Sequence, residues 1–224
     1  MKRSEINQEI RKALHFFEEM KIKLPPWAYW SPDEWKKSTA HCDEIIKNQL
    51  GWDLTDFGSG SYHECGLLLF TLRNGNLKLD QKPYSEKLMI VEEGQETPMH
   101  FHWTKMEDII NRGGGNLIIQ LFPSDENADL ADHEFEVSLD GIRHKCNPGD
   151  ELQLRPGESI TLYPGLYHKF YGESGFGKVL LGEVSAVNDD HTDNRFHSEI
   201  GRFPEIEEDQ APLRLLVNDY RTFL

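Results

Sequence analysis

The stretch EVSLDGIRHKCNPGDELQLRPGESITLYPG, residues 136–165, decides the fold class. Its short apolar runs are separated by the turn signals DG, NPGD, RPGE and YPG. Asp-Gly between two extended runs is typical of a tight β-hairpin, because both positions must adopt a positive φ. The stretch therefore predicts several short antiparallel strands in succession.

The same pattern extends over most of the chain, from Cys65 to Val187. Runs such as GLLLFTL, KLMIVEEG, NLIIQLF and KVLLGEVSAV alternate with turn residues, and Asn74-Gly75 predicts a further tight hairpin. At least eight strand candidates lie in this region, and no helical periodicity of useful length interrupts them. We therefore expect a mainly β fold, either a β-sandwich or an antiparallel β-barrel.

The first fifty residues predict helices instead. Ile6, Ile10 and Phe17 belong to one apolar stripe at helical spacing, with Ser4 as a candidate N-cap, and Pro25-Pro26 ends this first helix. SPDEW, residues 31–35, has the pattern of a capping box with proline at the first helical position. A second helix is therefore expected to begin near residue 32, run into the forties and end before residue 51.

These patterns divide the chain into two parts of one domain. We expect residues 1–50 to be an N-terminal helical extension packed on the barrel, and residues 51–224 to form the barrel with a C-terminal tail. The tail begins with a polar stretch after Asn188, which predicts a loop, and ends with LRLLVNDYRTFL, which predicts a packing segment.

The composition excludes several classes of partner. The formal net charge of −15 repels phosphate backbones and anionic lipid, so neither nucleic acid nor a membrane is expected as a partner. Cys42, Cys65 and Cys146 lack any paired spacing, which indicates free thiols in a reducing compartment. Since the first residues also lack the apolar core of a signal peptide, we expect a cytoplasmic protein.

Residues 99–108, MHFHWTKMED, contain the clearest chemical pattern. If PMHFHW is a strand, His100 and His102 project from the same face, where two imidazoles can hold one metal ion. Glu107 follows a short turn, so its carboxylate can reach the same ion. A fourth ligand has to come from another part of the chain. The alternative is three polar residues that are neighbours by chance.

Flanking residues make this stretch resemble the first motif of the cupin family, G-x5-H-x-H-x3,4-E-x6-G, which Gly94 and Gly114 complete. Gly157, Gly165 and His168 fit the second motif, although tyrosine and glycine replace its proline and asparagine at positions 163 and 172. The resemblance implies a cupin-type antiparallel barrel, or jelly roll, with one divalent metal. The ligands that it implies are His100, His102, Glu107 and His168. Such a ligand set suits Mn, Fe, Co, Ni or Zn better than Ca or Mg.

Over nearly its full length the chain also resembles the D-lyxose isomerase family of cupin-type aldose–ketose isomerases. The resemblance rests on LPPWAYWSPDEW, HFHWTKMEDIINRGGG, LYPGLYHKFYGE and GEVSAVNDDHTDNRF. It implies interconversion of D-lyxose and D-xylulose, with D-mannose and D-fructose as further substrates. It also implies metal-assisted proton transfer through a cis-enediol, most often with Mn²⁺, and many cupins pair as homodimers.

Aldose–ketose isomerisation needs groups that move a proton between C1 and C2 beside the metal. Lys105, inside the metal motif, is either a solvated turn lysine or a proton donor to a substrate oxygen. Glu183, in the strand candidate KVLLGEVSAV, is either an exposed residue or an inward carboxylate whose pKa burial would raise. We take Lys105 and Glu183 as the candidate catalytic residues.

Four further residues are candidates for binding the sugar. Asp193 and Arg195 follow the last strand candidate, where a loop either covers the mouth of the barrel or is simply solvated. Trp27 either provides an aromatic wall for the sugar or packs against the core, and Lys87 can reach a distal hydroxyl group.

Two other functions fit the same ligand set. An Fe(II) dioxygenase uses two histidines and a carboxylate, but nothing in the sequence indicates an oxidisable substrate. A non-catalytic sugar-binding cupin would have no need of a complete ligand set. Fold resemblance alone does not decide among these functions.

Overall fold

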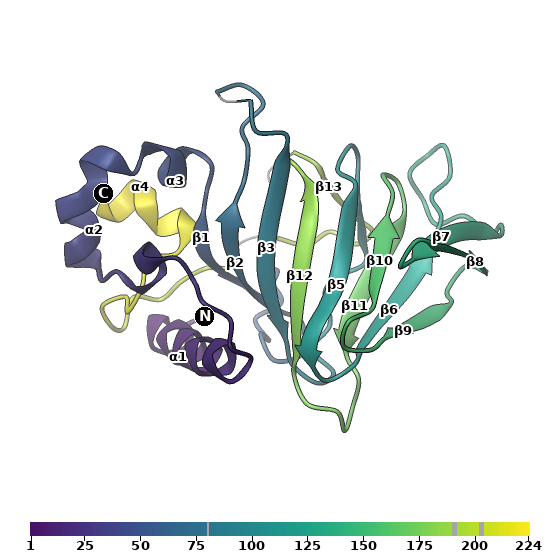
Figure 1. Ribbon diagram of the computed structural model, residues 1–224, viewed down its shortest axis with the longest axis horizontal. Helices are drawn as coiled ribbons and strands as arrows, with labels where there is room; N and C mark the ends of the chain where they lie inside the picture. Colours follow the sequence, from purple (N-terminus) through teal and green to yellow (C-terminus); the bar gives the residue numbers. More distant parts are fainter. Residues whose placement is uncertain (80, 190–191, 202–203) are drawn as a thin grey trace.

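Two antiparallel β-sheets form the framework of the protein (Figure 1). The structure is a computed structural model that describes residues 1–79, 81–189, 192–201 and 204–224. The larger sheet has eight strands in the order β1-β2-β3-β12-β5-β10-β7-β8, and the smaller has five in the order β13-β4-β11-β6-β9. The expectation of a mainly β, cupin-type fold with an N-terminal helical segment is therefore confirmed.

The larger sheet contains β1 (Gly51–Thr55), β2 (Leu67–Arg73), β3 (Tyr84–Val91), β12 (Val179–Ala186), β5 (Glu107–Gly114), β10 (Ser159–Leu162), β7 (Phe135–Leu139) and β8 (Ile142–Cys146). The smaller contains β13 (Asn194–Phe196), β4 (His100–His102), β11 (Tyr167–Gly172), β6 (Leu117–Phe122) and β9 (Glu151–Leu154). Eleven of these strands, β2 to β12, lie in the region where the sequence predicted at least eight.

The main core lies between the two sheets. Leu69, Met89 and Ile109 of the larger sheet belong to the same buried cluster as Ile119 and Phe170 of the smaller sheet. Successive side chains of a strand point to opposite faces, so alternate residues enter this core. The inward face of the sheets near one end of this core carries the polar residues described below.

The first N-terminal helix covers the outer face of the larger sheet at its β1–β3 end (Figure 1). Helix α1 (Arg3–Glu19) buries Ile6, Ile10 and Phe17, and these pack in one cluster with the outward-facing Leu68 and Phe70 of β2. Strand β2 is therefore buried on both faces, which explains its unbroken apolar run. The remaining helical segments are η1 (Pro26–Tyr29), α2 (Pro32–Ser38), η2 (Thr39–His41), α3 (Asp43–Lys47), η3 (Val217–Asp219) and α4 (Tyr220–Phe223).

The helix starts were predicted with mixed success. The capping box of Ser31 and Glu34 is confirmed, with the serine Oγ accepting the Glu34 N–H at 3.4 Å. Ser4 is not a cap, because α1 begins one residue before it and Ser4 binds the Asp209 carboxylate. The single long second helix is also wrong: Thr39 Oγ1 bonds to the Trp35 carbonyl oxygen at 2.8 Å, and a 3-10 turn separates α2 from α3.

The two predicted hairpins also differ in outcome. Asp140-Gly141 joins β7 to β8, with φ values of 49° and 82°, as a tight turn requires. Asn74-Gly75 does not form a tight hairpin, because residues 74–83 connect β2 to β3. The Asn74 side chain is buried in contacts with other segments, and Gly75 packs against the Lys82 carbonyl oxygen, where a Cβ would lie only 1.8 Å away.

The C-terminal tail returns to the helices. Leu215, Leu216 and Tyr220 are buried, which confirms the predicted packing segment, whereas the short strand β13 interrupts the predicted loop. Asp190, His191, Arg202 and Phe203 of this tail lie outside the described residues.

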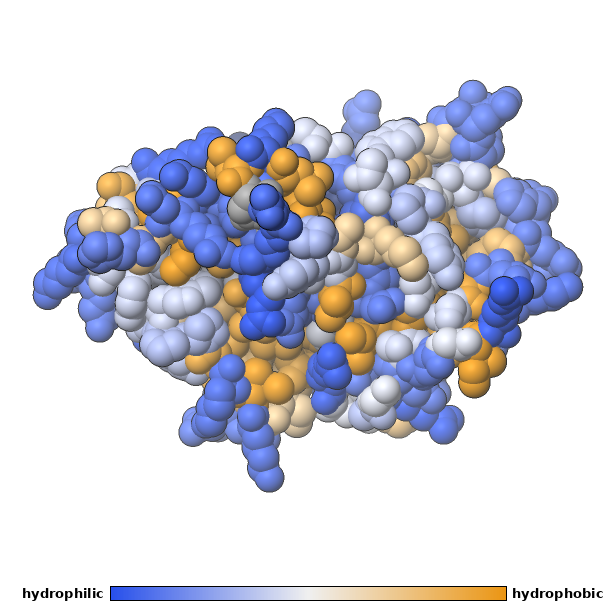
Figure 2. Space-filling view, turned by 45° about the horizontal axis from the view of Figure 1, so that its top comes forward, coloured by the Kyte–Doolittle hydropathy of each residue, from blue (hydrophilic) through white to orange (hydrophobic). Residues whose placement is uncertain are grey.

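Much of the visible exterior is polar. Figure 2 shows hydrophilic side chains over much of the face that it views, with hydrophobic groups between them. Among the helices in the described part of the chain, none has the length and apolar character needed to span a membrane.

Candidate active and metal site

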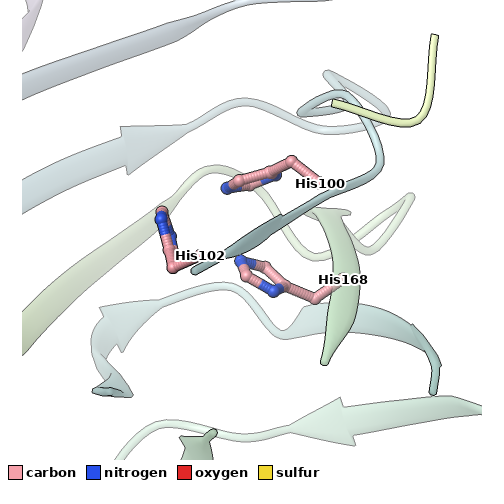
Figure 3. Close-up of side chains that lie close together, drawn as sticks. All are labelled: His100, His102 and His168. Carbon is pink, nitrogen blue, oxygen red and sulfur yellow. The ribbon is translucent and has the colours of Figure 1, made fainter. Parts of the chain in front are cut away.

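Three histidine side chains meet at the inner face of the smaller sheet. His100 and His102 lie two residues apart on β4, and β11 pairs with β4 so that His168 is directly opposite His100. Their ligand atoms all lie within 4.8 Å of one another, and the rings point toward a common centre (Figure 3). Strand alternation therefore places two imidazoles, and strand pairing supplies the third.

Backbone carbonyl groups hold two of the rings in place. His100 Nδ1 lies 2.8 Å from the Pro98 carbonyl oxygen, and His168 Nδ1 lies 3.0 Å from that of Leu166. A proton on each Nδ1 leaves the Nε2 lone pair free, which is the usual arrangement for metal-binding histidines. Burial, followed by the neighbouring imidazoles, lowers the pKa of His100 well below its ordinary value, so that ring is neutral.

Glu107, at the start of β5, brings a carboxylate to the histidines. Its Oε1 atom lies 3.3 Å from His102 Nε2 and 3.2 Å from His168 Nε2, and the side chain is buried. Burial by itself would raise the pKa of Glu107, but Lys105 and the histidines hold it well below its usual range. The group is therefore an ionised carboxylate inside the protein.

This donor set fits a divalent transition metal. Neutral imidazoles and an ionised carboxylate are the forms that bind such ions. His102 Nδ1 is buried without a hydrogen-bond partner in the described structure, 4.0 Å from Asp193 Oδ2. Three imidazoles and one carboxylate at these separations can surround a single divalent ion.

A second group of buried charges adjoins the histidines. Lys105 Nζ lies 2.7 Å from Glu107 Oε2 and 3.0 Å from Glu183 Oε1. Lys87 Nζ lies 3.1 Å from the same Glu183 oxygen, to which Ser185 Oγ also donates a hydrogen bond at 3.1 Å. Two ammonium groups thus balance two carboxylates in a region where a lone charge would be costly.

The solvated alternative for Lys105 is therefore wrong, as is the exposed alternative for Glu183: only 3% and 4% of their surfaces are accessible. The expected rise in the pKa of Glu183 is also wrong. Burial does act in that direction, but Lys105 and Lys87 outweigh it and lower the pKa. Glu183 is consequently a carboxylate, able to accept a proton.

One cavity contains the histidines and this charged group. Its polar walls are His100, His102, His168, Glu107, Lys105, Glu183, Lys87, Thr97 and Asn194, and the rest is apolar, including Met89, Ile109 and Phe170. Phe57 and Phe196 complete the lining, with ring centroids 6.2 Å apart, and the Phe196 ring lies 5.6 Å from that of His100. A hollow that combines convergent polar groups with apolar walls suits a small polar molecule.

Residues 1–220 match the model of a protein family described as D-lyxose isomerase. The chain belongs to the D-lyxose isomerase family. It is 50% identical over 226 aligned residues to the D-lyxose/D-mannose isomerase of Escherichia coli O157:H7, and 50% identical over 227 to that of Serratia proteamaculans. Both alignments cover 100% of each chain. Membership makes the chain an isomerase, and a sugar isomerase in particular.

Solved structures of L-ribose isomerases have a similar fold. The structure from Cellulomonas parahominis superposes with a TM-score of 0.63, covering 92% of this chain and 98% of that one, at 16% sequence identity. At this identity the likeness concerns the fold alone. It agrees with the cupin-type architecture of this member of the D-lyxose isomerase family.

The four residues predicted to bind the sugar lie in different places. Lys87 lines the cavity, whereas the described residues that line it do not include Trp27, Asp193 or Arg195. Trp27 stacks on Phe70 with ring centroids 5.0 Å apart, outside the larger sheet. Arg195 pairs with Phe101 across β13 and β4, so it shares the face of the sheet that points away from the histidines.

Asp193 contacts the turn between the two halves of the metal motif. Its Oδ1 atom accepts hydrogen bonds from the Thr104 N–H and hydroxyl group, both at 2.8 Å, and its Oδ2 accepts the Lys105 N–H at 3.0 Å. These contacts fix the backbone from which the Lys105 side chain enters the cavity.

Several site residues were missed by reasoning from the sequence. Ser185 shares a face of β12 with Glu183, so the period of two was a usable signal for it. Phe196 and Asn194 lie on a strand too short to recognise in a polar stretch. Asn188, which contacts both lysines, lies beyond the end of β12 and carries no pattern of its own.

Proposed function

We propose that the protein is a metal-dependent aldose–ketose isomerase that interconverts D-lyxose and D-xylulose, and also D-mannose and D-fructose. One observation carries the proposal: four candidate ligands and the buried Lys105–Glu183 pair line the same cavity. The names of the relatives, which are 50% identical over their whole lengths, support the choice of sugars.

His100, His102, Glu107 and His168 would hold one divalent cation, for which Mn²⁺ is our first choice and Zn, Co, Fe and Ni are alternatives. When bound, such a cation polarises the carbonyl and hydroxyl oxygens of the sugar. Neutral imidazoles leave most of the cation's charge available, since Glu107 is the single anionic ligand in the proposed set.

Glu183 is the proposed base, because the two lysines keep it ionised at neutral pH and ready to take a proton from C1 or C2. After exchange with solvent, Glu183 returns a proton to the neighbouring carbon of the cis-enediol. Lys105 donates a hydrogen bond to a substrate oxygen, and Lys87 does so to a more distal hydroxyl group. Asp193 positions Lys105 through the turn that it holds. Contacts of Trp27 and Arg195 with the substrate stay predictions.

We also propose that the chain forms one domain, acts as a homodimer in the cytoplasm and has no nucleic acid or membrane partner. All three cysteines are free thiols, and two are buried, which supports a reducing compartment. The dioxygenase and the non-catalytic binder receive no support from membership in an isomerase family.

The test is ketose formation in heavy water. Purified protein with Mn²⁺ is expected to convert D-lyxose to D-xylulose and D-mannose to D-fructose, with solvent deuterium appearing at C1 or C2. Formation of ketose without deuterium would indicate a hydride shift instead of proton transfer. No ketose from either sugar would contradict the proposed activity.

A further inference from the structure

The side chain of Asn188 lies between the two buried lysines. Its Oδ1 atom accepts hydrogen bonds from Lys87 Nζ at 2.7 Å and from Lys105 Nζ at 3.2 Å. The same two ammonium groups meet at Glu183 Oε1, at 3.1 Å and 3.0 Å. The amide oxygen and the carboxylate oxygen are therefore bridged twice, once by each lysine.

The backbone of Asn188 is fixed independently of its side chain. The Asn188 N–H donates to Asn74 Oδ1 at 2.9 Å, and Asn74 Nδ2 donates to the Asn188 carbonyl oxygen at 3.0 Å. Asn74 and Asn48 exchange a similar pair of bonds, at 3.2 Å and 3.0 Å. A chain of amides thus connects the end of helix α3 to the lysines, and both Asn48 and Asn74 are buried.

A neutral acceptor has a particular advantage at this position. Lys87, Lys105, Glu107 and Glu183 already balance in charge, so a third carboxylate is not needed for neutrality. An amide oxygen bonds ammonium groups more weakly than a carboxylate does. It therefore holds both lysines while Glu183 keeps the stronger hydrogen bonds. A carboxylate at this position would still bridge both lysines but would compete with Glu183, so its effect should lie between those of the amide and of an apolar side chain.

We infer that Asn188 is a positioning residue, which holds the ammonium groups of Lys87 and Lys105 at fixed places beside Glu183. This inference rests on the proposed isomerase function, in which Glu183 moves the proton and Lys105 faces a substrate oxygen. Without the amide oxygen, each lysine loses one of its anchors and can shift along the carboxylates. Small displacements of catalytic groups are costly because proton transfer needs a defined geometry.

The experiment compares Asn188→Leu and Asn188→Ser, which cannot bridge both lysines, with Asn188→Asp, which keeps an acceptor of the same shape. Asn116→Leu is the matched control, because Asn116 is also largely buried but donates to Glu173, outside the cavity. For every variant, kcat and KM for D-lyxose are measured with Mn²⁺, together with bound metal and the thermal unfolding midpoint.

We expect Asn188→Leu to lower kcat by about 10²-fold, with KM changed by less than about threefold, because geometry rather than binding is lost. Asn188→Ser should also lower kcat. Asn188→Asp should keep a kcat at least about tenfold above that of Asn188→Leu. Bound metal and the unfolding midpoint should match those of Asn116→Leu, whose kcat stays near that of the wild type.

Three results would overturn the inference. In the first, Asn188→Leu or Asn188→Ser keeps at least half of the wild-type kcat. In the second, Asn188→Asp loses as much activity as Asn188→Leu, which would indicate a purely structural role. In the third, the wild-type protein forms no ketose at all, so that the proposed function fails and the positioning role fails with it.

Discussion

At the level of single residues, Glu183 and its two lysines form the charged part of the cavity. A buried carboxylate usually has a raised pKa, and this expectation from the sequence is wrong here because two ammonium groups lie within 3.1 Å of it. The same contacts exclude a solvated role for Lys105. Charge balance inside the cavity, rather than burial alone, therefore sets the protonation state of the proposed base.

Replacing Lys87 with methionine should move the pH dependence of the reaction. Lys87 lowers the pKa of Glu183, and the carboxylate form is present above that pKa. Loss of one positive charge raises the pKa, so the acid limb of the kcat/KM profile for D-lyxose should shift to higher pH. Lys47→Met, at an exposed lysine, is the control, and an unmoved acid limb in Lys87→Met would contradict the role given to Lys87.

At the level of secondary-structure elements, strand pairing brings these residues together. Glu183 of β12 is directly opposite Lys87 of β3, so the ion pair is a cross-strand pair on the inner face of the sheet. His168 of β11 reaches His100 of β4 in the same way. The site thus depends on the register of two separate strand pairs, one in each sheet.

Helix α1 and the C-terminal segment are joined by a buried ion pair. The Arg3 guanidinium group is fully buried and donates two hydrogen bonds to Asp219, at 2.9 Å and 2.8 Å, and also contacts Glu208. Arg3→Met leaves the Asp219 carboxylate buried without its partner. We expect a loss of about 3–5 kcal/mol in the free energy of unfolding.

Urea unfolding monitored by far-UV circular dichroism measures this loss, with Arg221→Met at an exposed arginine as the control. Unfolding of both variants at the same urea concentration would contradict a stabilising role for the Arg3–Asp219 ion pair.

At the scale of the whole molecule, features that depend on a few neighbouring residues were predicted better than contacts between distant segments. Turn residues such as Asp140-Gly141 predicted the β architecture, and the spacing of His100, His102 and Glu107 predicted a site, because these signals operate over a few residues. Asn74-Gly75 misled because the Asn74 side chain bonds to Asn188, 114 residues away. No local pattern encodes such a contact, which is why Asn188 was missed.

In the proposed function, a divalent metal held by His100, His102, Glu107 and His168 enables sugar isomerisation. The most direct measurement titrates Mn²⁺ into chelator-treated protein and records bound metal and the rate of D-xylulose formation together. We expect one metal ion per chain and a rate that rises in proportion to bound metal, and we expect neither response in His168→Gln. Full activity in the metal-free protein, or unchanged metal binding in His168→Gln, would contradict this proposal.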